Sequence, residues 1–106
     1  MTQSDFNLLF IQQVNRCEET LRGKAKEYTG NNPDRLSAFK TAAALQECTP
    51  ERALAGMMAK HIISIYDMCF SEQADYDQSI WNEKITDTLN YLFLLNALVR
   101  EEGSHE

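Results

Sequence analysis

Residues 81–91, W-N-E-K-I-T-D-T-L-N-Y, begin the C-terminal helical segment around which the chain is organised. An α-helix advances about 100° per residue, so one face of this segment carries Glu83, Asp87 and Asn90. The same face then continues as apolar side chains, at Leu94, Ala97 and Leu98. Two carboxylates therefore lead into apolar surface. A partly buried acidic row of this kind is where a cation or a cationic partner is expected.

The composition is that of one small, acidic, folded domain. The chain has 106 residues, with 16 acidic against 10 basic side chains and a formal net charge of −6. This balance argues against a nucleic-acid-binding protein, which needs a basic patch to neutralise phosphates. It leaves room for a small phosphorylated ligand, because a bound divalent metal would reverse the local field. The longest apolar run is only residues 91–95, so no membrane segment is expected.

The cysteines predict reduced thiols rather than disulfides or a zinc site. Cys17, Cys48 and Cys69 are odd in number and widely spaced, and with His61 and His105 they form no pair at metal-ligand spacing. The N-terminal residues lack the basic and apolar regions of a signal peptide. These features indicate a cytoplasmic protein.

Apolar spacing and turn residues predict a single all-α domain spanning residues 1–106. No stretch has the period of a β-strand, and the segments between the helical patterns are short. We therefore expect a roughly antiparallel four-helix bundle. The helices are expected at about residues 4–28, 33–46, 50–70 and 80–100, with a frayed tail at 101–106.

The expected helix starts rest on capping residues. Ser4 or Asp5 can cap the first helix, and Asp77 or Ser79 the fourth. The second and third helices share a stronger signal, a polar cap followed by proline at the first helical position. This signal occurs at Asn32-Pro33 and at Thr49-Pro50.

Three side chains inside the helical patterns admit two interpretations each. Lys24 and Tyr28 continue the apolar stripe of the first helix, so Lys24 either covers the edge of the core with its stem or points into a pocket. His61 lies in the middle of the apolar stripe of the third helix. A core or interface histidine is favoured there, and a ligand or an acid–base group is the alternative.

Glu83 and Asp87 are the strongest candidates for chemistry. Their carboxylates lie one helical turn apart and can both reach a magnesium ion, which prefers hard oxygen ligands. The alternative is that they stabilise the positive end of the helix dipole. A third acid would have to come from another helix, either Asp67 or the Glu18-Glu19 pair. Asn90 can orient a water or contact a ligand, with Lys84 and Tyr91 beside it.

Two short motifs carry a resemblance to a known group. Residues 24–30, K-A-K-E-Y-T-G, resemble the K-x-x-D-Y-G element of small phage and prophage proteins with a nucleotide-modification-associated, MazG-like helical domain. Residues 87–91, D-T-L-N-Y, match the D-x-x-N-Y element of the same group. The similarity extends over roughly residues 20–100.

The resemblance implies an oligomeric all-α nucleoside triphosphate pyrophosphohydrolase that uses magnesium to split the α–β bond of a nucleotide. That superfamily holds the metal with E-E-x-x-E on one helix and E-x-x-D on the next. In this chain Arg22 stands where the third glutamate would be, and four residues separate Glu83 from Asp87. The predicted metal ligands are Asp87, which matches the smaller group directly, and Glu83 and Asp67, which are assigned by position; Glu83 and Asp87 are also predicted to be catalytic. The implied substrate-binding residues are Lys24, Tyr28, Lys84, Asn90 and Tyr91.

Two hypotheses of different classes follow. The first is a magnesium-dependent pyrophosphohydrolase, or a nucleotide-binding protein, in phage nucleotide metabolism. The second is a non-enzymatic helical phage protein, either an accessory subunit or a binder of a host factor. Its motivation is the incomplete acidic motif and the apolar pair Leu94 and Leu98, which would suit an interface between helices. Both hypotheses predict a homo-oligomer.

Overall fold

A computed structural model describes residues 1–71 and 76–103, apart from the side chain of Tyr28. These residues form four α-helices and contain no strand, which confirms the all-α expectation for the described part of the chain. The helices are α1 (Gln3–Thr29), α2 (Ser37–Gln46), α3 (Pro50–Phe70) and α4 (Gln78–Gly103). Within the described residues, no helix is long and apolar enough to span a membrane.

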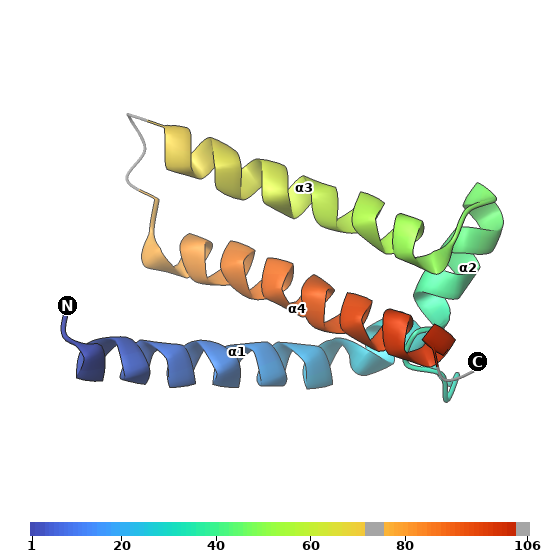
Figure 1. Cartoon of the computed structure of the whole chain (residues 1–106), viewed down its shortest axis with the longest axis horizontal. Coiled ribbons are helices and arrows are strands. Elements are labelled where there is room, and N and C mark those ends of the chain that lie inside the picture. The colour runs from blue at the N-terminus through green and yellow to red at the C-terminus, as the bar shows by residue number, and fades with distance from the viewer. Residues whose placement is uncertain (72–75, 104–106) are drawn as a thin grey trace.

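The three long helices lie side by side, with α4 between α1 and α3 (Figure 1). The short α2 packs across one end of this arrangement and contacts α3 and α1. Neighbouring α3 and α4 run in opposite directions, whereas α1 runs in the same direction as α4. The predicted antiparallel arrangement therefore holds for α3 against α4 and not for α1 against α4.

The core lies at the end of the molecule that α2 covers. Its fully buried cluster comprises Leu36, Phe39, Leu54 and Leu98. Leu94 packs against this cluster from the same face of α4. Leu98 is buried and Leu94 packs against the core of the same chain, so the pair does not form the exposed apolar surface that would suit an interface between subunits.

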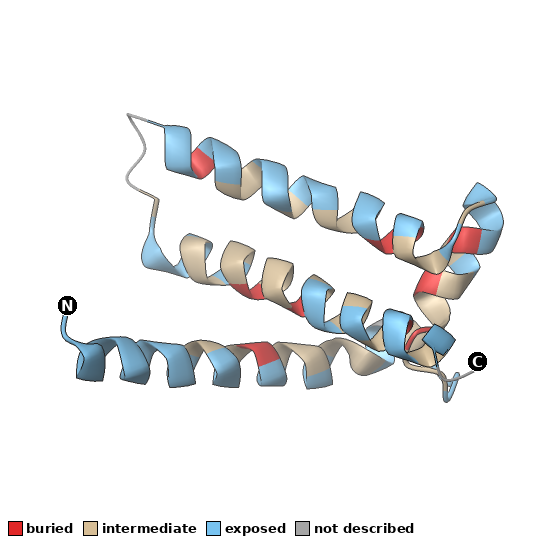
Figure 2. Cartoon of the chain, viewed as in Figure 1, coloured by how far each residue is buried: buried red, intermediate tan, exposed pale blue. Residues whose placement is uncertain are grey.

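Burial along α4 confirms the predicted row that leads into the core. Glu83 is exposed, Asp87 is partly buried, and Asn90 and Leu98 are buried. Figure 2 shows that exposed surface predominates on α1 at the end away from α2, whereas the first half of α4 is mostly of intermediate burial.

Local capping chemistry explains where α1 and α3 begin. Thr2 caps α1 by accepting a hydrogen bond from the Asp5 backbone N–H at 3.1 Å, and the Asp5 carboxylate accepts one from the Thr2 N–H at 3.2 Å. The sequence predicted Ser4 or Asp5 as the cap of this helix. Asp5 is instead the third residue of a capping box whose cap is Thr2. The predicted start of α3 is confirmed, with Thr49 as cap and Pro50 as the first helical residue.

The start of α2 differs from the prediction by four residues. Asn32 was expected to cap a helix beginning at Pro33, but α2 begins at Ser37. The Asn32 side chain instead accepts from the Asp34 N–H at 2.9 Å, and the Asp34 side chain accepts from the Leu36 N–H at 3.0 Å. These side-chain bonds close two successive turns and satisfy backbone donors without a helix.

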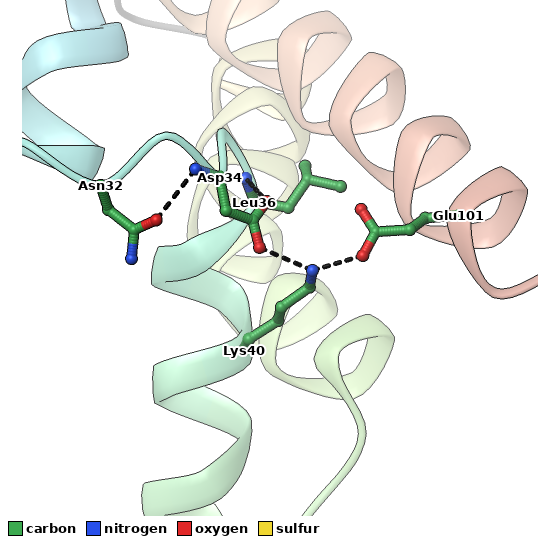
Figure 3. A network of polar contacts seen from close by, with 5 residues as sticks. All are labelled: Asn32, Asp34, Leu36, Lys40 and Glu101. Atoms are coloured by element: carbon green, nitrogen blue, oxygen red, sulfur yellow. Dashed lines mark hydrogen bonds and ion pairs between the residues drawn. The ribbon is translucent and has the colours of Figure 1, made fainter.

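A polar network fixes this turn to the last turns of α4 (Figure 3). Lys40 of α2 donates to Asp34 at 2.6 Å and also pairs with Glu101. Its hydrogen bond to Asp34 lowers the pKa of that carboxyl, helped by the Leu36 N–H. The same bond, followed by the one to Glu101, raises the pKa of Lys40. The network joins the turn, α2 and α4 at one end of the core.

Candidate functional site

A cavity of about 170 Å³ lies among the four helices, beside the core. Its apolar wall is made mainly of Leu21, Phe39, Met57 and Leu94. Its polar and aromatic lining comprises Lys24, Arg35, His61, Asp87, Asn90 and Tyr91. An apolar cavity with a few convergent polar groups is the usual form of a small-molecule site.

Asp87 is the centre of the polar side of this cavity. Its Oδ1 atom lies 3.7 Å from Lys24 Nζ, and its Oδ2 atom lies 3.8 Å from His61 Nδ1. The Asp87 side chain is only 15% exposed, so it faces the Lys24 ammonium and the His61 ring in a poorly solvated setting. The His61 ring also packs against Tyr91, with the ring centroids 5.2 Å apart. The cluster therefore joins α1, α3 and α4.

Lys24 and His61 both line the cavity, whereas a role of His61 as a ligand or an acid–base group stays a prediction. Each side chain lines the cavity and faces a carboxylate across a distance too long for a direct hydrogen bond. His61 Nδ1 is buried and has no hydrogen-bond partner among the described residues. Both groups are therefore arranged so that a ligand could contact them.

Asn90 is the most unusual group in the site. It is 6% exposed, and neither its Nδ2 nor its Oδ1 atom has a hydrogen-bond partner in the described part of the chain. Leaving a buried donor or acceptor unpaired costs about 1–3 kcal/mol. Native proteins rarely retain such groups without a reason. Because Asn90 lines the cavity, a ligand could supply both missing partners.

The charge lining the cavity favours an anion. Lys24 and Arg35 supply two positive charges against the single carboxylate of Asp87. This local excess contrasts with the net charge of −6 for the whole chain. Arg35 precedes α2 and donates a 3.5 Å hydrogen bond to the Leu21 carbonyl, which connects this side chain to α1. Sequence reasoning missed Arg35, because a single basic residue in a turn has no motif or periodicity to mark it.

The remaining predicted residues lie elsewhere. Glu83 is exposed and lines a second cavity, described below. Asp67 is exposed on α3 and lines neither cavity, and Lys84 is partly buried and also lines neither. The predicted role of Tyr28 concerns a side chain outside the described residues.

The second cavity adjoins the first between α1 and α4 and has a volume of about 420 Å³. The two share Lys24 and Asp87 in their lining. Acidic residues Glu19 and Glu83 line the second cavity, as does Arg16, whose Nε atom is buried without a partner among the described residues. Two acids named from the sequence thus line one cavity together with Asp87.

The predicted magnesium ligands do not form a metal centre as the side chains stand. The described residues contain no group of three His, Cys, Asp or Glu side chains that could hold a metal ion. Asp67 is exposed on α3 and does not line the cavity that Glu83 and Asp87 share. Asp87 is already paired with Lys24 and with His61 when that ring is protonated. Magnesium binding by these residues therefore stays a prediction from the sequence.

Comparison of the chain with protein-family models, curated proteins and solved structures finds no match. The resemblance to MazG-like proteins therefore rests on the short motifs alone. The site has to be interpreted from its own residues.

Proposed function

We propose that the first cavity, lined by Lys24, Asp87 and Asn90, binds a phosphate-bearing ligand with a flat ring, of which a nucleotide is the leading candidate. The observation that carries the proposal is the buried, unpaired amide of Asn90 in a cavity with an excess of positive charge. A ring with donor and acceptor groups at its edge would satisfy that amide. Phosphate oxygens would pair with the cationic side chains.

The size and lining of the cavity support a particular orientation of such a ligand. At about 170 Å³ it is smaller than the roughly 300–1,000 Å³ that enclose drug-sized molecules, so it suits a single ring. The ring would pack against Tyr91 and the apolar wall formed by Leu21, Phe39 and their neighbours. Phosphates would extend to the rim, where the Lys24 side chain is 41% exposed.

Pyrophosphohydrolase activity, which the sequence resemblance implies, is a more specific form of this proposal. Asp87 belongs to both cavities, so a ligand that filled the first could extend its phosphates toward the carboxylates of Glu19 and Glu83. Because the described residues contain no group of three side chains that could hold a metal ion, we assign no magnesium-dependent step to them. Magnesium is varied only in the turnover experiment.

A thermal-shift and calorimetric screen of ribo- and deoxynucleotides tests ligand binding. We expect at least one nucleotide to raise the unfolding temperature of the wild type and to lose most of this effect in Lys24→Ala. The matched control is Lys26→Ala, which removes an exposed lysine from the same helix. If no nucleotide at millimolar concentration shifted the wild type, or if both variants behaved alike, the proposed ligand would be wrong.

Pyrophosphate release in the presence and absence of magnesium tests the enzymatic form. Metal-dependent turnover that disappears in Asp87→Ala, with helicity retained, would establish a hydrolase. Binding without turnover across the panel would limit the protein to nucleotide binding. Absence of both would favour the non-enzymatic alternative, a helical accessory or host-factor-binding protein, which the exposed apolar side chains Leu92, Phe93 and Val99 support.

A further inference from the structure

The N-terminal half of α1 leaves an unusual amount of apolar surface uncovered. Six large apolar side chains within residues 6–14 are each between 42% and 60% exposed. They are Phe6, Leu8, Leu9, Phe10, Ile11 and Val14. Single exposed apolar residues are normal, but a contiguous group of six on one helix marks an interaction surface.

These side chains surround the helix and do not form a single stripe. At about 100° per residue, Phe6 and Phe10 lie on one side, and Leu8 and Ile11 lie on the other. A helix that is apolar all round belongs in a buried setting. Within the described residues, α1 contacts α4 and α2 but not α3. Figure 1 shows that α1 begins at the end of the molecule opposite α2.

The same end of the molecule carries a second apolar group on α3. Ile62, Ile63, Tyr66 and Phe70 are all large and exposed, and the Tyr66 and Phe70 rings stack with centroids 4.6 Å apart. Figure 1 places the end of α3 beside the start of α4 at this end of the molecule. At this end of the molecule, the N-terminal half of α1 and the last turns of α3 thus leave ten large apolar side chains uncovered.

The ten side chains together expose about as much area as one partner of a stable dimer buries. Large apolar side chains have about 150–200 Å² of surface each, and ten of them at roughly half exposure present about 900 Å². A standard interface buries about 800 Å² on each partner, whereas the largest patch of a typical monomer is about 300–600 Å².

The charge pattern identifies a second copy of this chain as the partner. Residues 6–15 contain no charged side chain, although 25% of the whole chain is charged. A two-fold interface brings each surface against its own copy, so like charges there would repel. Two copies with a net charge of −6 repel overall, and the uncharged segment 6–15 gives them a face without local repulsion. The uncharged side chains of Gln12 and Asn15 can hydrogen-bond to amide side chains of the second copy across such an axis, because an amide both donates and accepts.

We propose that the N-terminal half of α1 forms a homodimer interface by packing against the equivalent half-helix and the exposed end of α3 of a second copy. This interface is independent of the proposed ligand and lies at the end of the molecule away from α2. It also explains why a helix with so much apolar surface is stable in a small acidic chain.

Sedimentation and light scattering on a dilution series test the interface. The wild type is expected at twice the chain mass of 12.2 kDa at micromolar concentration. Phe10→Glu and Ile11→Glu, whose side chains leave the helix about 100° apart, are each expected to weaken the dimer by more than about 100-fold, because every substitution occurs twice across the axis. Both side chains are more than half exposed in the single chain, so the folded monomer should retain its helicity.

Leu45→Glu is the matched control, because Leu45 is 82% exposed on α2. This variant is expected to remain dimeric. A wild type that is monomeric up to about 200 µM, a concentration at which even weak dimers form, would overturn the proposal. So would helical Phe10→Glu and Ile11→Glu proteins that remain dimeric, or a Leu45→Glu protein that dissociates equally.

Discussion

Replacement of Asn90 by leucine should stabilise the protein and abolish ligand binding. Asn90 is buried, and both polar atoms of its amide lack partners among the described residues. Leucine has nearly the same shape, and the apolar wall of the cavity is compatible with it. Asn90→Leu therefore removes the desolvation cost of the amide without leaving a void.

The expected gain follows from that cost. An unsatisfied buried polar group costs about 1–3 kcal/mol, and the amide has two such atoms that share one side chain. We expect the free energy of unfolding to rise by about 1–3 kcal/mol. For a domain of this size, 1 kcal/mol corresponds to about 4 °C or more in unfolding temperature.

Chemical and thermal denaturation at one fixed protein concentration, together with nucleotide titration, measure both effects. Thr86→Val is the control, because Thr86 is equally buried one turn earlier on α4 but accepts a hydrogen bond from Gln13 at 2.8 Å. That variant should lose about 0.5–1.5 kcal/mol. An Asn90→Leu protein less stable than the wild type, or one that binds nucleotide with unchanged affinity, would refute the reasoning.

Three further predictions concern stability. Leu54 is completely buried in the core, so Leu54→Ala should lower the free energy of unfolding by about 2–5 kcal/mol in urea denaturation. The hydrogen bond from Lys40 lowers the pKa of Asp34, so the ionised carboxylate stabilises the folded protein above its ordinary pKa of 3.8, and this stabilisation is lost as the pH falls. Asp34→Asn should therefore be less stable than wild type at pH 7, and the difference should narrow in acid. The hydrogen bond to the Glu51 carboxyl and burial raise the pKa of Glu102 above its ordinary value of 4.5. The protonated Glu102 carboxyl therefore stabilises the folded protein below pH 4.5, and this stabilisation is lost as the pH rises. Thermal scans should therefore find Glu102→Gln more stable than wild type at pH 7 and equal to it below pH 4.5.

Sequence reasoning found much of the candidate site because the site is built on α4. Asp87, Asn90 and Tyr91 all line the cavity, and the helical period that grouped the first two is a local property of the chain. The same period also put Glu83 in the row, but Glu83 lies farther from the core and is exposed. Periodicity assigns a face to a residue and does not say where along that face another helix will cover it.

Residues on other helices were harder to assign. Asp67 and His61 both belong to α3, yet His61 lines the cavity and Asp67 is exposed. The apolar stripe of the helix favoured His61 on the side of the core, whereas Asp67 was a candidate because a third acid had to come from another helix. Arg35 lies in the turn before α2, and the position of that turn depends on side-chain bonds that replaced the expected first helical turn.

The sequence by itself determined that the chain forms four helices, the start of α3 at Thr49-Pro50 and the gradient from acid to apolar along α4, because these depend on neighbours within a few residues. The tertiary structure alone decided that Lys24, His61 and Asp87 meet at one cavity, and that Asn90 is buried there without partners. The physical reason is that helix packing brings together side chains far apart in the chain. Which faces meet is set by the shape and burial of the whole core, and no local pattern contains that information.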